Sequence, residues 1–227
     1  MQSLIGQLEI KVNDKIFLKD PNSSDLGKNI ISQSIQLIDQ IGLENFTFRK
    51  LAKALRTAES SIYRYFESKH KLLIYIISWY WGWMEYQLVF SINNITALEE
   101  RLRMAITVIS KDIGLEESYG HIDLNVLNRI VISESAKAYL TKEVDDANKE
   151  GFYVGYKRLV ARISDIILEI RPDFKYAHTL TSTIVEGVHH QKYFADHLPS
   201  LTDFKGDVKE LATFYSDMAL ACVNKNK

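Results

Sequence analysis

The sequence contains one cysteine, three prolines and ten glycines among 227 residues. Because Cys222 stands alone, neither an intrachain disulfide nor a cysteine-based zinc cluster can form, as is usual in a reducing cytoplasm. Few prolines and glycines leave room for long helices and argue against a fold of strands and turns. Met1–Lys11 also lacks a basic region followed by a long apolar run, so no signal peptide is expected. These features indicate an all-α cytoplasmic protein.

No hydrophobic run is long enough for a membrane span. The best candidate, Leu72–Phe90, is uncharged only up to Met84, and a run of about 13 residues is too short to cross a bilayer. The segment is better explained as a helix with bulky rings on every side. Two roles stay open for these rings, a buried linker helix or the lining of a ligand pocket. The rings belong to Trp79, Tyr80, Trp81, Trp83, Tyr86 and Phe90.

The formal net charge of −1 gives no overall sign of nucleic-acid binding. The charge is unevenly distributed, however. The stretch 42–72 has seven basic and three acidic side chains, a net +4, so the remainder of the chain is acidic. A basic segment joined to an acidic body is typical of a protein that contacts DNA with one part only.

Hydrophobic periodicity predicts helices along most of the chain. The first covers about 25–41 with Ile31, Ile35 and Ile38 on one face, and Gly42 ends it. A second opens at the N-cap Thr47, a third covers about 58–65 and a fourth opens at Ser68. Further helices are expected at about 96–112, 122–139, 142–170, 174–197 and 203–223, with a loop containing Gly114 and Gly120.

Residues 1–24 differ from the rest. Leu8–Val12 alternates apolar and charged residues, Asn13-Asp14 offers a turn, and Lys15–Leu18 follows, which suits a small hairpin or an extended arm. A partly ordered tail is favoured over a basic arm that contacts DNA.

The segment Thr47–Phe66 contains two short helices joined by about three residues, the arrangement of a helix-turn-helix motif. Its small core comprises Leu51, Ala52, Leu55 and Ile62. We expect the outward side of the second short helix to show Glu59, Ser60, Ser61, Arg64 and Tyr65.

Residues from about 28 to 74 resemble the TetR family of repressors. The resemblance implies a helix-turn-helix domain at 25–70, which follows the arm at 1–24 and precedes a helical regulatory and dimerisation domain at 71–227. It rests on Gly42, Phe46-Thr47, Leu51-Ala52, Leu55, Ile62–Phe66, Ser68-Lys69 and Leu72-Leu73.

The resemblance also implies which residues contact DNA. Arg49 matches a base-contacting position, whereas Thr47, Tyr63 and Lys69 match phosphate-contacting positions. A helix N-terminus independently favours a phosphate near Lys69. Ser60, Ser61 and Tyr65 match groove-facing positions, and Arg64 suits guanine or phosphate. The candidate DNA-binding residues are therefore Thr47, Arg49, Ser60, Ser61, Tyr63, Arg64, Tyr65 and Lys69.

The turn departs from the family pattern. It reads Arg56-Thr57-Ala58 where Gly-Val-Ser is usual. Arg56 must therefore either tolerate a left-handed backbone or relax the turn. Ala58 cannot cap the next helix through its side chain, although Thr57 could.

The last two expected helices carry apolar stripes with small residues. In the family such helices build a four-helix dimer interface, and the alternative is a core pair within one chain. The stripes comprise Tyr176, Leu180, Ile184, Gly187 and Val188, and Val208, Leu211, Ala212, Tyr215, Met218 and Ala219.

We expect neither an enzyme nor a metal or cofactor site, because no nucleophile–base set, phosphate loop or metal cluster is found. The histidines 189, 190 and 197 lack a chelating pattern. The leading hypothesis is a homodimeric repressor that binds a palindromic operator in double-stranded DNA and is released by a small hydrophobic effector. The alternative is a helical ligand- or protein-binding module whose helix-turn-helix no longer reads specific DNA.

Overall fold

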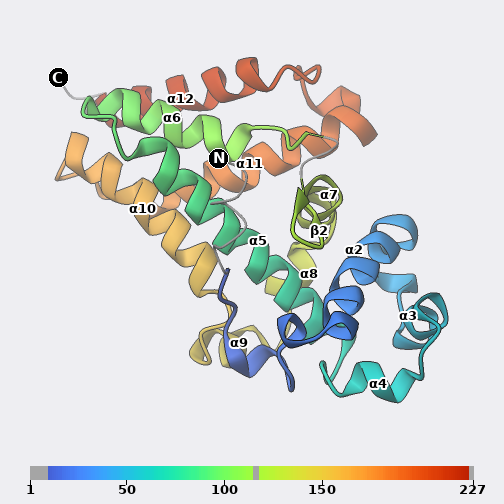
Figure 1. Ribbon diagram of the computed structural model, residues 1–227. Coiled ribbons are helices and arrows are strands. Elements are labelled where there is room, and N and C mark those ends of the chain that lie inside the picture. The colour runs from blue at the N-terminus through green and yellow to red at the C-terminus, as the bar shows by residue number, and fades with distance from the viewer. Residues whose placement is uncertain (1–9, 115–117, 225–227) are drawn as a thin grey trace. The chain divides into compact units, whose positions relative to one another are not determined.

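The computed structural model describes residues 10–114 and 118–224, and they form an all-α protein (Figure 1). The chain divides into two compact units. Unit 1 comprises Met1–Gly82 and Ile113–Val154, and unit 2 comprises Trp83–Asp112 and Gly155–Lys227. No helix in the described ranges is long and apolar enough to pass through a membrane.

Unit 1 contains the helices expected around the basic segment. We call α2, α3 and α4 the head. The elements of unit 1 are η1 (Asp14–Ile16), η2 (Pro21–Ser23), α2 (Asp25–Asn45), α3 (Phe48–Leu55), α4 (Glu59–Tyr63), the first part of α5 (Lys69–Ile92), β1 (Ser118–Tyr119), β2 (Ile122–Asp123), α7 (Leu124–Glu134), α8 (Ala136–Tyr139) and α9 (Val144–Lys149).

Helix α2 begins with a side-chain cap and buries the expected face. The Ser24 side chain accepts the Gly27 N–H at 3.1 Å, and Ile31, Ile35 and Ile38 are buried. The helix does not stop at Gly42 as predicted. Gly42 has φ +73° and ψ 156°, a conformation open to glycine, and one more turn follows up to Asn45 in a new direction. We call the stretch from Gly42 to Phe46 the α2 corner.

Helix α5 is apolar on all sides, as expected. Trp79, Tyr80, Trp81 and Trp83 are all buried, whereas Phe90 is exposed. The Trp81 indole N–H donates to the Tyr139 hydroxyl of α8. The rings of Trp79, Tyr80 and Trp81 therefore belong to the core of unit 1, whereas Trp83 belongs to unit 2.

Several expected elements differ in detail. The helix predicted at 142–170 is two helices, because Gly151 has φ +83° and interrupts it. The predicted loop around Gly120 contains a short antiparallel pair, with Ser118 opposite Asp123 and Tyr119 opposite Ile122. The second half of the predicted N-terminal hairpin is wrong, because residues 14–16 form the 3₁₀ helix η1. Leu8 and Glu9 of that hairpin lie outside the described residues.

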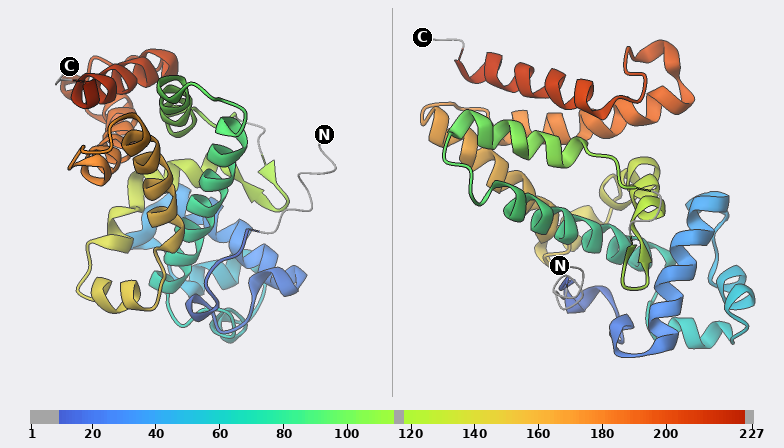
Figure 2. Two further views of the ribbon diagram at one scale, coloured as in Figure 1. Left: turned by 90° about the vertical axis from the view of Figure 1, so that its left-hand side faces the viewer. Right: turned by 45° about the horizontal axis from the view of Figure 1, so that its top comes forward.

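Unit 2 consists of the last part of α5, α6 (Leu98–Ser110), α10 (Val154–Ile170), α11 (Ala177–His197), η3 (Pro199–Leu201) and α12 (Val208–Asn224). Helix α12 lies along α6, and α11 also contacts both (Figure 2). Glu85 of α5 accepts from Arg158 and Arg162 of α10, both at 2.8 Å, which joins those two helices.

The apolar stripes of α11 and α12 fill the core of unit 2. Ile184, Val188, Leu211 and Ala219 are buried within one chain. A Cβ on Gly187 would lie 2.5 Å from the Tyr215 hydroxyl, so the glycine permits the close approach of the two helices. The buried members of these stripes therefore pack within one chain, which is the second of the two alternatives for these residues, and whether the exposed members meet a second chain stays a prediction.

Candidate nucleic-acid interface

Helix α3 forms as its sequence indicates. Thr47 is its N-cap, and the Thr47 side chain accepts the Lys50 N–H at 3.2 Å. Phe48, Leu51 and Ala52 are buried, and Ile62 of α4 is buried with them. The opposite side of α3 exposes Arg49 and Lys53, which are four residues apart and share one face.

The turn between α3 and α4 keeps its left-handed backbone without a glycine. Arg56 has φ 52° and ψ 43°, the single positive φ among the described residues other than glycine. Such a conformation costs an L-residue roughly 1–2 kcal/mol. Helix α4 begins after Ala58, and no side chain caps it, so the expected alternative of a Thr57 cap is not realised.

One face of α4 presents polar side chains. Tyr63 and Arg64 come three and four residues after Ser60, and all three are exposed. Ser61 is half-buried. Within the described parts of the chain, Arg49, Lys53 and Arg64 form no ion pair with a carboxylate. These three cations therefore remain available to phosphates.

The two tyrosines at the end of α4 have different surroundings. Tyr63 is 47% exposed, and its ring packs edge-on against Phe48 at 5.0 Å between centroids. The expectation that Tyr65 lies on the outward side is wrong, because Tyr65 is only 3% exposed. Its hydroxyl lies 2.7 Å from Ser24 Oγ. The ring of Tyr65 thus belongs to the core beneath the exposed polar face of α4.

Lys69, at the first turn of α5, holds the α2 corner. Its ammonium donates to the backbone carbonyls of Leu43, Glu44 and Phe46 at 2.9, 3.2 and 3.3 Å. An ammonium has three N–H donors, so all of them are used. The Lys69 side chain would have to release a carbonyl before it could bind a phosphate.

Two residues that the sequence did not single out, Glu134 and Lys137, also bind the α2 corner. Glu134, the last residue of α7, accepts the Leu43 N–H at 3.0 Å and is 8% exposed. Lys137 of α8 pairs with Glu134 at 2.7 Å and with Glu44 at 3.1 Å. The hydrogen bond and charge of Lys137 lower the pKa of Glu44. No local sequence pattern indicates this contact, because Leu43 and Glu134 are 91 positions apart.

Further polar contacts run along α2 and α7. Arg129 donates from Nε and Nη2 to the two carboxylate oxygens of Asp39, at 2.9 and 2.7 Å. Gln36 donates to Asp123 at 3.3 Å. With the α2 corner, these bonds fix α2 along its second half, and α2 in turn carries α3 and α4.

The family comparison agrees with this geometry. Residues 30–76 match the model described as bacterial regulatory proteins, tetR family. This segment is therefore similar to the N-terminal domain of the TetR family. The match begins inside α2 and ends inside α5, so it includes the whole helix-turn-helix and the α2 corner. No curated protein matches the sequence.

Solved structures share the fold beyond the TetR-family domain. AibR in complex with isovaleryl coenzyme A and operator DNA aligns with a TM-score of 0.57 and 18% identity, over 83% of this chain and 95% of that chain. The fatty acid degradation regulator FadR from Bacillus halodurans gives 0.59 and 19%, over 85% and 96%. The superantigen PfiT gives 0.58 and 16%, over 88% and 97%. At such low identity the likeness shows the fold alone.

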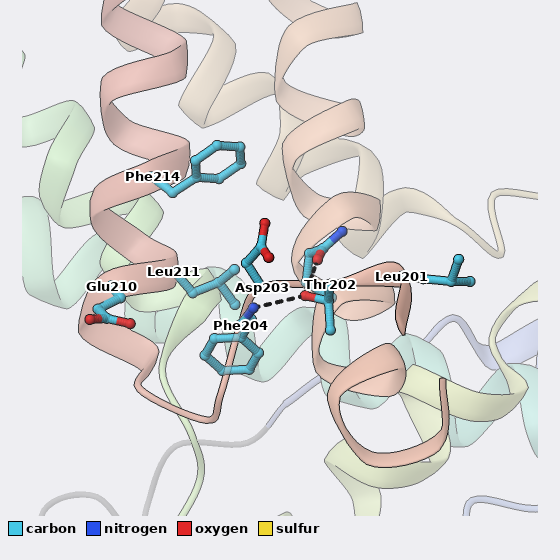
Figure 3. A pocket seen from close by; sticks show the side chains of 8 residues that line it. Leu201, Thr202, Asp203, Phe204, Glu210, Leu211 and Phe214 are labelled. Atoms are coloured by element: carbon cyan, nitrogen blue, oxygen red, sulfur yellow. Dashed lines mark hydrogen bonds between the residues drawn. The ribbon is translucent and has the colours of Figure 1, made fainter. Parts of the chain in front are cut away.

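Unit 2 has a surface pocket of about 380 Å³ at the turn between α11 and α12 (Figure 3). Phe214 projects from α12 and is 60% exposed, and Leu201 is 57% exposed. Thr202 donates to Gln191 and accepts the Phe204 N–H, which orders the loop. The remaining lining residues are Asp203, Glu210 and Leu211.

Proposed function

We propose that this TetR-family protein is a dimeric, sequence-specific transcriptional repressor that a small apolar molecule releases from its operator. The functional division would follow three segments, an N-terminal segment at 1–24, the DNA-binding domain at 25–70 and a regulatory part at 71–227. The observation that carries the proposal is that α3 and α4 expose arginine, lysine, serine and tyrosine side chains on one side, while their other side forms a buried core.

Within this face we assign base contacts to Arg49, Ser60 and Arg64, because arginine and serine side chains can reach base edges in the major groove. Thr47 and Tyr63 are assigned to phosphates. Ser61 lies at the edge of the face. Lys69 is assigned to holding the α2 corner, because its three donors are already used.

The first experiment is footprinting on DNA from upstream of the protein's own coding sequence, followed by fluorescence anisotropy on the protected fragment. We expect a protected palindrome, and we expect Arg49→Ala to weaken binding by about fivefold to 150-fold, because a good base contact is worth roughly 1–3 kcal/mol. Tyr63→Ala should also weaken binding, because it removes a phosphate contact. Lys205→Ala, at an exposed lysine of unit 2, is the control for Arg49→Ala, because it makes the same change of charge.

Weak binding without sequence preference, equal in the control and both variants, would contradict the proposal. It would favour a ligand- or protein-binding module whose head is only a scaffold.

Dimerisation is proposed because one recognition helix reads few base pairs, so two copies are needed for a long operator. The exposed Phe214 and Leu201 beside the pocket offer an apolar edge on α12 for the second copy. We expect Phe214→Asp to shift the protein to a monomer in analytical ultracentrifugation, whereas Thr213→Asp, also exposed on α12, leaves the dimer intact.

The effector proposal is supported by a protein of similar fold, AibR, whose structure holds both isovaleryl coenzyme A and operator DNA. Binding of such a molecule to the helical body would change the separation of the two heads. Acyl coenzyme A thioesters, which carry an apolar acyl chain on the charged coenzyme A, are therefore the first compounds to add to the operator complex, and free coenzyme A is the control for the acyl chain. Release by the thioester alone supports the proposal, and a complex that no thioester disturbs contradicts this choice of effector.

A further inference from the structure

The segment Ile10–Ser24, which we call the N-terminal brace, precedes the residues that the family model matches. It is packed against unit 1 along its length. Ile10 and Ile16 are buried at 7% and 2% exposure. A Cβ on Gly82 would lie 2.8 Å from Ile10 Cγ2, so this glycine of α5 makes room for the brace. In Figure 1 the dark-blue segment passes beside α9 before it reaches α2.

The start of the brace is tied to the end of α9. Asn13 donates from its side chain to the Glu150 carbonyl at 2.7 Å. The middle of the brace packs on Tyr75 of α5, since the Phe17 ring lies 5.9 Å from the Tyr75 ring in an edge-on contact. Asn22 also reaches the Tyr75 hydroxyl, at 3.4 Å.

The end of the brace contacts Tyr65 in three ways. The Leu18 N–H donates to the Tyr65 carbonyl at 2.8 Å. Ser24 Oγ lies 2.7 Å from the Tyr65 hydroxyl. The Lys19 ammonium lies 5.2 Å from the centre of the Tyr65 ring. Backbone, hydroxyl and ring of this one residue are therefore all held by the brace.

Tyr65 follows the last residue of α4 by two positions. Helix α4 has five residues and no side-chain cap at its N-terminus. A helix this short is not stable by itself in water, so its position depends on tertiary contacts at its ends. Ile62 anchors its inner face, and the brace fixes its C-terminal end through Tyr65.

We propose that the N-terminal brace is a positioning element for operator recognition, which sets the orientation of α4 through Tyr65 and does not itself contact DNA. The inference rests on the proposed function. It adds residues outside the helix-turn-helix to those that operator binding requires. It also assigns a role to the backbone N–H of Leu18, which binds the Tyr65 carbonyl.

Leu18→Pro tests the hydrogen bond directly, because proline has no N–H to donate. The Leu18 side chain is 60% exposed, so Leu18→Ala is a matched control that keeps the N–H. Phe17, with φ −129° and ψ 157°, already has the backbone that a residue before proline adopts. We expect Leu18→Pro to weaken binding to the protected fragment about tenfold relative to Leu18→Ala. Binding to unrelated DNA should be equal in both variants.

Amide hydrogen exchange without DNA separates the brace from the proposed function. We expect faster exchange in residues 59–66 of Leu18→Pro than of Leu18→Ala. If Leu18→Pro exchanges faster than Leu18→Ala but the wild-type protein binds no operator, the proposed function is overturned, whereas the conclusion that the brace positions α4 stands. Equal exchange and equal affinity in the two variants would overturn the brace. Should Leu18→Pro fail to fold, Ile16→Ala loosens the brace without touching Tyr65 and should act in the same direction.

A DNA-contacting arm predicts a different result. Lys11 and Lys15 are exposed on the brace. If they bound phosphates, the double variant Lys11→Ala/Lys15→Ala would reduce the slope of log affinity against log salt by about 0.9 for each lost contact. The brace predicts an unchanged slope and an unchanged affinity. A reduced slope would overturn the proposal in favour of the arm.

Discussion

Replacing Glu134 by alanine tests how α7 and α8 support the head formed by α2, α3 and α4. Glu134 accepts the buried Leu43 N–H and pairs with Lys137, which also reaches Glu44. The alanine variant would leave the Leu43 N–H without an acceptor at the α2 corner. An unsatisfied buried donor costs about 1–3 kcal/mol, and bonds to charged groups lie at the upper end of that range. We therefore expect a loss of about 2–3 kcal/mol in the free energy of unfolding.

Glu134→Gln separates the two contacts. The amide oxygen can still accept the Leu43 N–H, whereas the charge that attracts Lys137 is lost. The lost ion pair is partly exposed on the lysine side, so we expect a smaller cost of about 1 kcal/mol. This smaller loss should shrink further at high salt, whereas the loss in the alanine variant should persist because its main cause is an unpaired donor.

The assay is urea unfolding followed by circular dichroism, with Glu143→Ala as the control. Glu143 is exposed in unit 1, and its replacement makes the same change of charge. Operator affinity measured on the same samples should fall in the order wild type, glutamine, alanine. The reasoning is refuted if the alanine variant unfolds at the same urea concentration as the control with an unchanged slope.

Three further substitutions follow from the geometry. Arg56→Gly should raise the unfolding free energy by up to about 1 kcal/mol, because glycine accepts the left-handed conformation of φ 52° freely. The measurement is thermal unfolding, and an unchanged or lower melting temperature would contradict this prediction. Gly187→Ala should destabilise the protein, since its Cβ would lie 2.5 Å from the Tyr215 hydroxyl, and Tyr215→Phe should restore part of the loss; no rescue would argue against this clash. Burial, and then the charges of Lys192 and His190, lower the pKa of His189 to about 3, so below pH 6.5 the unfolded chain takes up a proton that the folded chain does not. Stability should therefore fall between pH 7 and pH 5 by about 2 kcal/mol from this group, and His189→Gln, compared at both pH values, should remove that part of the decline.

The sequence predicted those features whose causes are local. The isoleucine spacing of α2, the Thr47 cap and the small Ala52 each act within a few residues, so periodicity and cap rules identify the head correctly. The left-handed Arg56 was one of two outcomes that the missing glycine allowed. The structure shows that the neighbours enforce the strained backbone and do not relax the turn.

The features that could not be predicted depend on distant partners. The buried Tyr65 is contacted by Leu18, Lys19 and Ser24, more than 40 positions earlier, which single-sequence patterns do not connect to it. Glu134 and Leu43 are separated even further. The stripes of α11 and α12 were correctly identified as apolar, but periodicity shows only that a helix has a face to bury. It does not show whether α6 of the same chain or a second chain covers that face.

The aromatic character of α5 also gives the protein a built-in optical probe. All three tryptophans of the chain, at positions 79, 81 and 83, lie on this helix and are buried, so tryptophan emission, excited at wavelengths where tyrosine does not absorb, reports on α5 alone. Two of them belong to unit 1 and the third to unit 2. Single Trp→Phe variants would therefore assign any spectral change on adding DNA or a thioester to one unit or the other. No label need be attached, and the lone exposed thiol of Cys222 stays free for a second, independent dye.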